Sequence, residues 1–131
     1  MPKKATTSND LPSPAGPYSH LVEANGIVFT AGFGPQDPTT GDVSEGVAAQ
    51  TAQVISNLES ALAAVGLTLA DVVKTTVHLH HLDRDFVAYN ETYARLFPGP
   101  YPVRTTVGST LANILVEIDA VAIRTDGPPL Q

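Results

Sequence analysis

The spacing of apolar residues changes along the chain between the two-residue period of strands and the three-to-four-residue period of helices. Helical spacing predicts helices over 47–65 and 84–97. Alternating or β-branched runs predict strands over 17–23, 27–31, 72–80, 102–107 and 114–123. Asn25-Gly26 lies between the first two strands and predicts a hairpin turn there. The predicted element order is therefore ββαβαββ.

This order favours an α+β fold with one mixed sheet and both helices on one face. Ser44 is expected to cap the first helix and Gly66 to end it. The alternation in the central strand predicts that one face carries Val73, Thr75, Val77 and Leu79. The other sheet face also carries apolar residues, so we expect further copies of the chain to cover it in a homo-oligomer.

The length of 131 residues fits a single domain over 1–131. Residues 1–15 are rich in Pro, Ser, Thr and Asn, which predicts an N-terminal arm or loop. Residues 125–131 are expected to form a C-terminal tail.

Composition narrows the classes of function. The chain has no cysteine, which excludes disulfides, thiolate zinc sites and cysteine nucleophiles. Its net charge is −6 and its seven basic residues are scattered, so we expect no nucleic-acid ligand. No apolar run is long enough to cross a membrane, and no apolar stretch follows Lys3-Lys4. We therefore expect neither a membrane association nor a signal peptide, and a cytoplasmic location.

Arg104 is a lone cation in an otherwise uncharged strand. A buried arginine is costly unless it is paired, and its planar fork suits two-point contact with a carboxylate. One interpretation is a structural salt bridge, for instance to Glu117 or Asp119 on a neighbouring strand. The other is a binding site for the carboxylate of a ligand. The residue pattern favours neither interpretation over the other.

Three further polar residues have a structural and a functional interpretation. Glu117 interrupts an apolar strand and should face away from Val116 and Ile118, either into solvent or toward a bound water or substrate near Arg104. Tyr18 would either pack at the start of the first strand with its hydroxyl hydrogen-bonded, or close a pocket. Asn90 is unfavourable inside a helix, so we expect it to have a specific role, most commonly tying down a loop.

The spacing of three histidines is compatible with a metal site, but the further ligands that such a site needs are missing from the sequence. His78 and His80 are two residues apart on one strand, and His81 follows them. A zinc site needs further ligands, and the sequence offers neither cysteine nor a histidine-rich helix. We expect no metal site.

Short motifs follow one another in order along most of the chain. They are Gly16-Pro17-Tyr18, Val28-Phe29-Thr30-Ala31-Gly32, Pro38-Thr39-Thr40-Gly41, Gln50-Thr51, Asn57-Leu58, Asp71-Val72-Val73-Lys74-Thr75-Thr76-Val77, Tyr89-Asn90-Glu91-Thr92-Tyr93, Phe97, Pro102-Val103-Arg104-Thr105-Thr106-Val107 and Val116-Glu117-Ile118-Asp119-Ala120-Val121-Ala122. Each motif alone is weak, but their order and spacing are specific. From about Gly16 to Ile123 the chain resembles the Rid (YjgF/YER057c/UK114) family of reactive-intermediate imine deaminases.

The resemblance implies a chorismate-mutase-like fold and a homotrimer whose sheets form a central barrel, with clefts between subunits. It implies hydrolysis of 2-imino or enamine acids to 2-keto acids and ammonia, of the 2-iminobutanoate/2-iminopropanoate deaminase type, with no cofactor. In that reaction Arg104 would bind the substrate carboxylate and Glu117 would help place the attacking water. The other implied pocket residues are Tyr18, Ala31, Gly32, Phe33, Asn90, Thr105 and Thr106.

The chain departs from the family pattern around this pocket. Ala31 stands where Ser is usual, Phe33 where Gln is frequent and Thr106 where Cys is frequent, and the loop at 108–113 is shorter. These departures favour a second hypothesis, a non-catalytic or regulatory protein that binds a small carboxylate on the same trimeric scaffold. A third hypothesis, a ribonuclease, is a label often given to the family, and the acidic balance of this chain argues against it.

Overall fold

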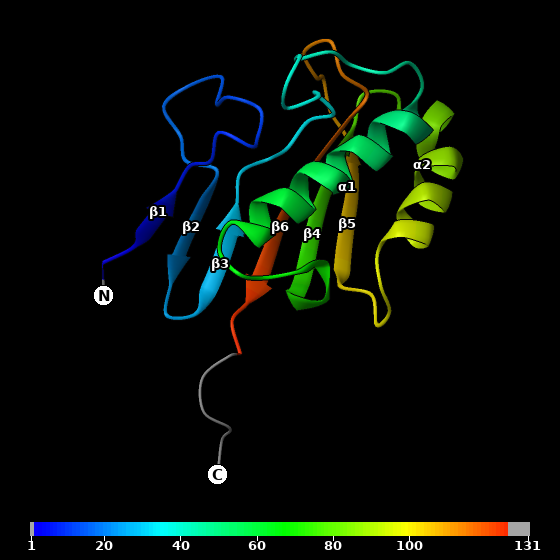
Figure 1. The fold of residues 1–131 in the computed structure, drawn as a ribbon. Helices are drawn as coiled ribbons and strands as arrows, with labels where there is room; N and C mark the ends of the chain where they lie inside the picture. The colour runs from blue at the N-terminus through cyan, green and yellow to red at the C-terminus, as the bar shows by residue number, and fades with distance from the viewer. Residues whose placement is uncertain (1, 126–131) are drawn as a thin grey trace.

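The computed structural model describes residues 2–125 of the chain, which form a six-stranded sheet with two helices on one face (Figure 1). A short 3-10 turn, Leu69–Asp71, precedes the central strand. The helices and strands are β1 (Lys4–Thr6), β2 (Leu21–Ala24), β3 (Ile27–Thr30), α1 (Val47–Ala63), β4 (Val72–Leu79), α2 (Leu82–Leu96), β5 (Val103–Gly108) and β6 (Val116–Ile123).

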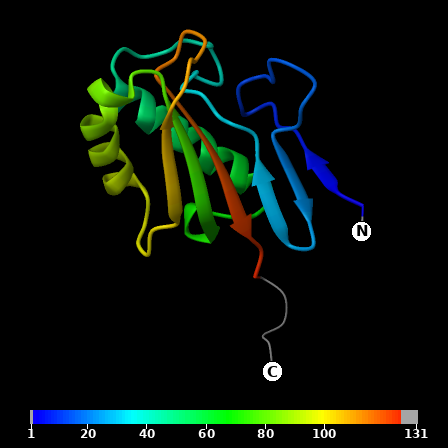
Figure 2. The same cartoon turned by 180° about the vertical axis from the view of Figure 1, so that it is seen from behind.

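The sheet is mixed, and its strand order is β1-β2-β3-β6-β4-β5. Strands β4 and β5 are parallel, whereas the other neighbouring strands are antiparallel. The predicted α+β class, mixed sheet and single helical layer are therefore confirmed. Figure 2 shows the opposite face, which no helix within residues 2–125 covers. We call it the open face. Neither helix is long and apolar enough to cross a membrane.

Two predictions for the N-terminal part are wrong. The predicted arm contains a strand, because Lys4–Thr6 pair with β2, and the observed order is βββαβαββ. The first predicted strand starts at Leu21 rather than at residue 17. Residues 17–20 do not join it because the Tyr18 N–H donates to the Gly16 carbonyl at 2.9 Å in a tight turn, and Pro17 has no N–H to offer a sheet.

The predicted cap of the first helix is also wrong. Helix α1 begins at Val47 after Gly46, and no side chain caps it, so Ser44 does not have that role. Gly46 has a φ of 86°, a left-handed conformation that residues with a Cβ rarely adopt. Gly66, with a φ of 78°, follows the end of α1 as predicted.

A β-bulge changes the alternation in the central strand. The register of β4 against β6 shifts between Val72 and Lys74, so Val73 turns outward and is 45% exposed. The prediction that Val73 shares a face with the rest of the strand is therefore wrong. Thr75, Val77 and Leu79 do share the buried face beneath the helices.

Other boundaries differ from the prediction by a few residues. Helix α2 begins at Leu82 and β6 at Val116, where the sequence predicted 84 and 114. On α2, Tyr89 and Tyr93 are buried together with Phe97, which directly follows the helix, but Phe86 and Leu96 are partly exposed. Of the predicted tail at 125–131, residues 126–131 lie outside the described residues.

The core lies between the helices and the sheet, and substitution of one buried helix residue tests this assignment. Val54 of α1 is 0% exposed, whereas Val87 of α2 is 68% exposed. We expect Val54→Ala to lower the free energy of unfolding by about 2 kcal/mol, because it removes buried methyl groups and leaves a cavity. Val87→Ala makes the same change in helix propensity and should leave the free energy of unfolding almost unchanged. Urea unfolding measures both, and equal costs would contradict this core assignment.

Candidate functional site

Arg104 lies on the edge strand β5 and points to the helical side of the sheet. It is in register with Thr75, whose side chain is buried beneath the helices. The guanidinium carbon lies 4.7 Å from the ring centroid of Tyr93 and 5.2 Å from that of Tyr89, both on α2. Its Nη2 donates to Asn90 Oδ1 at 2.8 Å. Asn90 therefore holds Arg104, rather than tying down a loop as we expected.

The aromatic residues beside Arg104 are themselves fixed by buried hydroxyls. The Tyr93 hydroxyl lies 2.7 Å from Thr75 Oγ1, and the Tyr89 hydroxyl lies 2.8 Å from Thr106 Oγ1. Burial raises the pKa of both tyrosines, which keeps them neutral, and the nearby charge of Arg104 opposes that rise. Arg104 thus rests on a rigid aromatic wall.

Arg104 borders a cavity of about 340 Å³, and no carboxylate within residues 2–125 pairs with it. The predicted alternative of a salt bridge to Glu117 or Asp119 is contradicted, because these residues face the open side of the sheet in register with His78 and Thr76. We call this cavity the Arg104 half-site, and its lining residues are Asn90, Tyr93, Ala94, Tyr101, Pro102 and Arg104.

Glu117 faces away from the helices, as predicted, and borders a different cavity of about 510 Å³. Its carboxylate packs against Gly32, where an added Cβ would overlap the glutamate side chain. Glycine at this position therefore leaves the room that the carboxylate occupies. We call this cavity the Glu117 half-site, lined by Tyr18, Ser19, Leu21, Val22, Phe29, Thr30, Ala31, Gly32 and Glu117.

An extra residue after β3 brings Gly32 to Glu117. Three residues lie between Phe29 and Phe33, but only two lie between their partners Val121 and Ile118 on β6. The bulge turns Phe33 into the core, where it is 4% exposed. Ala31 and Gly32 line the Glu117 half-site, whereas Phe33 lines a neighbouring cavity of about 560 Å³ that Tyr18, Gly32 and Glu117 also border.

The structure thus divides the predicted site residues between the two sides of the sheet. Tyr18, Ala31 and Gly32 lie with Glu117, whereas Asn90 lies with Arg104. Thr106 lies on the helical side, where it bonds to Tyr89, and Thr105 faces the open side in register with Thr76. Arg104 and Glu117 do not meet within residues 2–125 of one chain, because they border separate cavities on opposite sides of the sheet.

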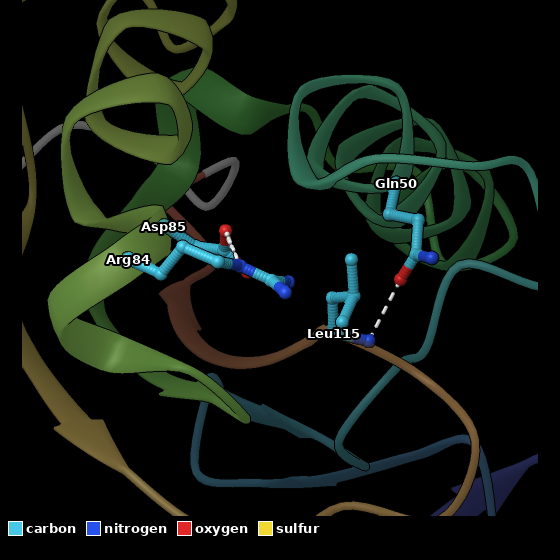
Figure 3. Close-up of polar contacts among 4 residues, drawn as sticks. All are labelled: Gln50, Arg84, Asp85 and Leu115. Atoms are coloured by element: carbon cyan, nitrogen blue, oxygen red, sulfur yellow. Dashed lines mark hydrogen bonds and ion pairs between the residues drawn. The ribbon is translucent and has the colours of Figure 1, made fainter.

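Two amide side chains of α1 fix the loops around the Glu117 half-site, and sequence reasoning gave them no role. Gln50 Nε2 donates to the Ser44 carbonyl at 2.9 Å, and its Oε1 accepts the Leu115 N–H at 2.8 Å (Figure 3). Asn57 Nδ2 donates to the carbonyls of Gly34 and Gln36, both at 3.0 Å. Gln50 and Asn57 are seven residues apart, so they lie on the same face of the helix, and both are buried. Two amide residues at this spacing on the buried face are the sequence signal that could have identified their role.

Figure 3 also shows Arg84 and Asp85 of α2, which form an ion pair. The Nε and Nη2 of Arg84 donate to the Asp85 carboxylate at 2.8 and 3.0 Å. Asp85 is buried and Arg84 is exposed, so this pair satisfies the buried carboxylate from the surface.

Two histidines hold the loop that follows β5. His78 Nδ1 lies 2.6 Å from Ser109 Oγ, and His80 Nδ1 accepts the Leu111 N–H at 2.9 Å. Within the part of the chain that the structure describes, no group of three or more His, Cys, Asp or Glu side chains is placed to hold a metal ion.

Asp119 on the open face gives a test by pH. Burial raises the pKa of Asp119, and the charges of His78 and Lys74 oppose that rise. Ionised Asp119 is therefore penalised in the folded state, and the penalty is absent when the carboxyl is protonated. We expect Asp119→Asn to increase the free energy of unfolding, with a gain that is absent at low pH and grows as the pH rises above the usual aspartate pKa of about 4. Urea unfolding at several pH values checks this, with exposed Asp42→Asn as control. A gain independent of pH would contradict it.

Comparison with known proteins places this geometry in a family. The family model described as Endoribonuclease L-PSP matches residues 8–124. The 2-iminobutanoate/2-iminopropanoate deaminase of Salmonella typhimurium is 37% identical over 129 residues, covering 95% of this chain and 99% of that protein. A RutC family protein of Pyrococcus horikoshii is 38% identical over 125 residues, covering 93% and 98%.

A solved structure agrees with these sequence matches. Escherichia coli TdcF with bound serine has a TM-score of 0.87 and 31% sequence identity, covering 93% of this chain and 99% of that chain. With the family model spanning nearly all of the described residues, the chain belongs to the Rid family, whose model is described as Endoribonuclease L-PSP.

Proposed function

We propose that the protein hydrolyses 2-imino acids, or their enamine tautomers, to 2-keto acids and ammonia. The observation that carries the proposal is Arg104. Its guanidinium is oriented by Asn90 and an aromatic wall, borders a cavity and has no carboxylate partner within residues 2–125 of the subunit. A planar cation held in this way suits two-point binding of the carboxylate of a small acid.

The complete site, in this proposal, forms between subunits of a homotrimer whose sheets make a central barrel. Within one subunit the sheet separates Arg104 from Glu117, so a substrate that contacts both needs the Arg104 half-site of one subunit and the Glu117 half-site of another. Exposed Phe29 and Val107 on the open face are consistent with burial against further copies.

The reaction needs little acid catalysis from the protein, because an imine carbon is already electrophilic. Arg104 holds the carboxylate, and Glu117 accepts a hydrogen bond from a water and directs it at the imine carbon. The water oxygen bonds to the imine carbon while one water proton passes through Glu117 to the imine nitrogen, which gives a tetrahedral carbinolamine. As the C–N bond breaks, the hydroxyl proton is transferred to the nitrogen, the carbonyl forms, and the nitrogen departs as ammonia. The buried neutral tyrosines keep the wall beside Arg104 free of opposing charge.

A second candidate is a protein that binds a small carboxylate without turning it over. It is favoured by Ala31, which brings no hydroxyl to the Glu117 half-site, and by Phe33, whose side chain is in the core. A ribonuclease is not proposed, because among the residues lining the two half-sites Arg104 is the only cation. Phosphate backbones are bound by several basic residues together.

Arg104 variants separate the enzyme from the binding protein. We expect Arg104→Ala to lower kcat/KM by at least about 100-fold, because the carboxylate loses its anchor. Arg104→Lys should retain more activity, since it keeps the charge but loses the fork. An amino-acid oxidase can generate 2-iminobutanoate in the assay, and semicarbazide traps the imine that remains.

The matched control is Arg95→Ala, which removes an exposed arginine from α2 and should leave the rate unchanged. Wild-type rates in Arg104→Ala would show that Arg104 is not the carboxylate anchor. Binding of 2-ketobutyrate that depends on Arg104, without any loss of imine, would support the second candidate instead.

A further inference from the structure

The hydroxyl of Thr30 replaces a backbone carbonyl at the bulge that residues 30–32 form between β3 and β6. At the far end of this bulge the Ile118 N–H donates to the Phe33 carbonyl at 3.1 Å, as in a regular antiparallel ladder. By the two-residue alternation of β6, the Ala120 N–H points the same way, but it donates to Thr30 Oγ1 at 3.0 Å. A side chain therefore supplies the acceptor that the extra residue removes from the ladder.

The same hydroxyl also fixes the peptide group between Ala31 and Gly32. Thr30 Oγ1 donates to the Ala31 carbonyl at 2.7 Å. That carbonyl and the Gly32 N–H belong to one planar peptide group, so a bond to its oxygen orients the whole group. Backbone bonds hold both ends of the bulge, because the Ala31 N–H donates to the His20 carbonyl and the Phe33 N–H donates to β6, both at 2.9 Å. The Thr30 hydroxyl holds what lies between them.

The path of the chain at Gly32 determines the room left for the Glu117 carboxylate. Gly32 lies so close to Glu117 that an added Cβ would overlap the glutamate side chain. Both residues line the Glu117 half-site, and so does Thr30. A shift of the bulge would therefore give this carboxylate space to move, and a group that directs a water at a substrate is sensitive to small displacements.

We propose that Thr30 is a positioning residue, whose hydroxyl holds the bulge in place and thereby keeps Gly32 against the Glu117 carboxylate. Threonine suits this role, because one short hydroxyl both donates and accepts and its β-branch restricts the χ1 angle. Thr30 acts through Gly32 and Glu117 rather than on the substrate. Its effect on catalysis rests on the proposed function, whereas its hold on the bulge does not.

Two substitutions separate the hydroxyl from the shape of the side chain. Thr30→Val keeps the shape and removes the hydroxyl, whereas Thr30→Ser keeps the hydroxyl and removes a methyl group. With 2-iminobutanoate, we expect Thr30→Val to lower kcat at least about tenfold, because Glu117 no longer directs the water accurately. KM should stay within about twofold, since Arg104 binds the carboxylate in the other half-site. Thr30→Ser should retain kcat within about threefold of wild type, because the hydroxyl remains.

The matched control is Thr7→Val, which makes the same change at an exposed threonine outside both half-sites and should leave kcat unchanged. If Thr30→Val does not fold, Thr30→Ala takes its place in the comparison, because it also removes the hydroxyl.

Hydrogen exchange of the Ala120 amide supplies a readout that needs no activity. Its rate is divided by that of the Val77 amide, which lies in the buried centre of β4, so that a general loss of stability cancels. We expect this ratio to rise at least about tenfold in Thr30→Val, where the Ala120 N–H has lost its acceptor. In Thr30→Ser the ratio should stay close to that of wild type.

A kcat in Thr30→Val equal to that of wild type, or an equal fall in Thr30→Val and Thr30→Ser, would overturn the positioning role. An unchanged ratio of Ala120 to Val77 exchange in Thr30→Val would overturn it as well, because the hydroxyl would then not hold the bulge. If wild type hydrolyses no imine, the proposed function fails, and the exchange ratio still decides whether Thr30 holds the bulge in place.

Discussion

The two-residue period of the β-sheet places Arg104 and Glu117 on opposite sides of the sheet. β4 pairs with β5 on one side and β6 on the other, so its register fixes the directions of both key side chains. Arg104 is in register with Thr75 and points to the helices, whereas Glu117 is in register with His78 and points to the open face. No change of side-chain rotamer can bring Arg104 and Glu117 to the same side of the sheet. A reaction that uses both residues therefore depends on a second subunit, and this requirement links the proposed chemistry to the proposed assembly.

Each half-site is held rigid by contacts that involve few charges. Arg104 lies against tyrosines whose hydroxyls are bonded to threonines of the sheet, and Asn90 sets its orientation. Glu117 occupies space that Gly32 leaves open, beside loops that Gln50 ties to α1. Such positioning favours catalysis by orientation, which suits a substrate whose carbon is already electrophilic.

Apolar periodicity in the sequence predicts both helices and the mixed sheet, because those patterns are local. Arg104 is also visible in the sequence as an odd cation in an apolar strand. The short strand β1, the bulge at Val73 and the extra residue before Phe33 are not visible, since each depends on which strand pairs alongside. For the same reason the sequence leaves open a salt bridge between Arg104 and Glu117, which the register of β4 contradicts.

Mixing two inactive variants tests the shared site most directly. Arg104→Ala and Glu117→Gln subunits are unfolded together in equal amounts, refolded and assayed for imine hydrolysis beside each variant refolded alone. In a site that takes Arg104 from one subunit and Glu117 from the next, every mixed trimer contains one intact site, and the mixture should recover about one quarter of wild-type activity. A mixture no more active than the separate variants would contradict the shared site.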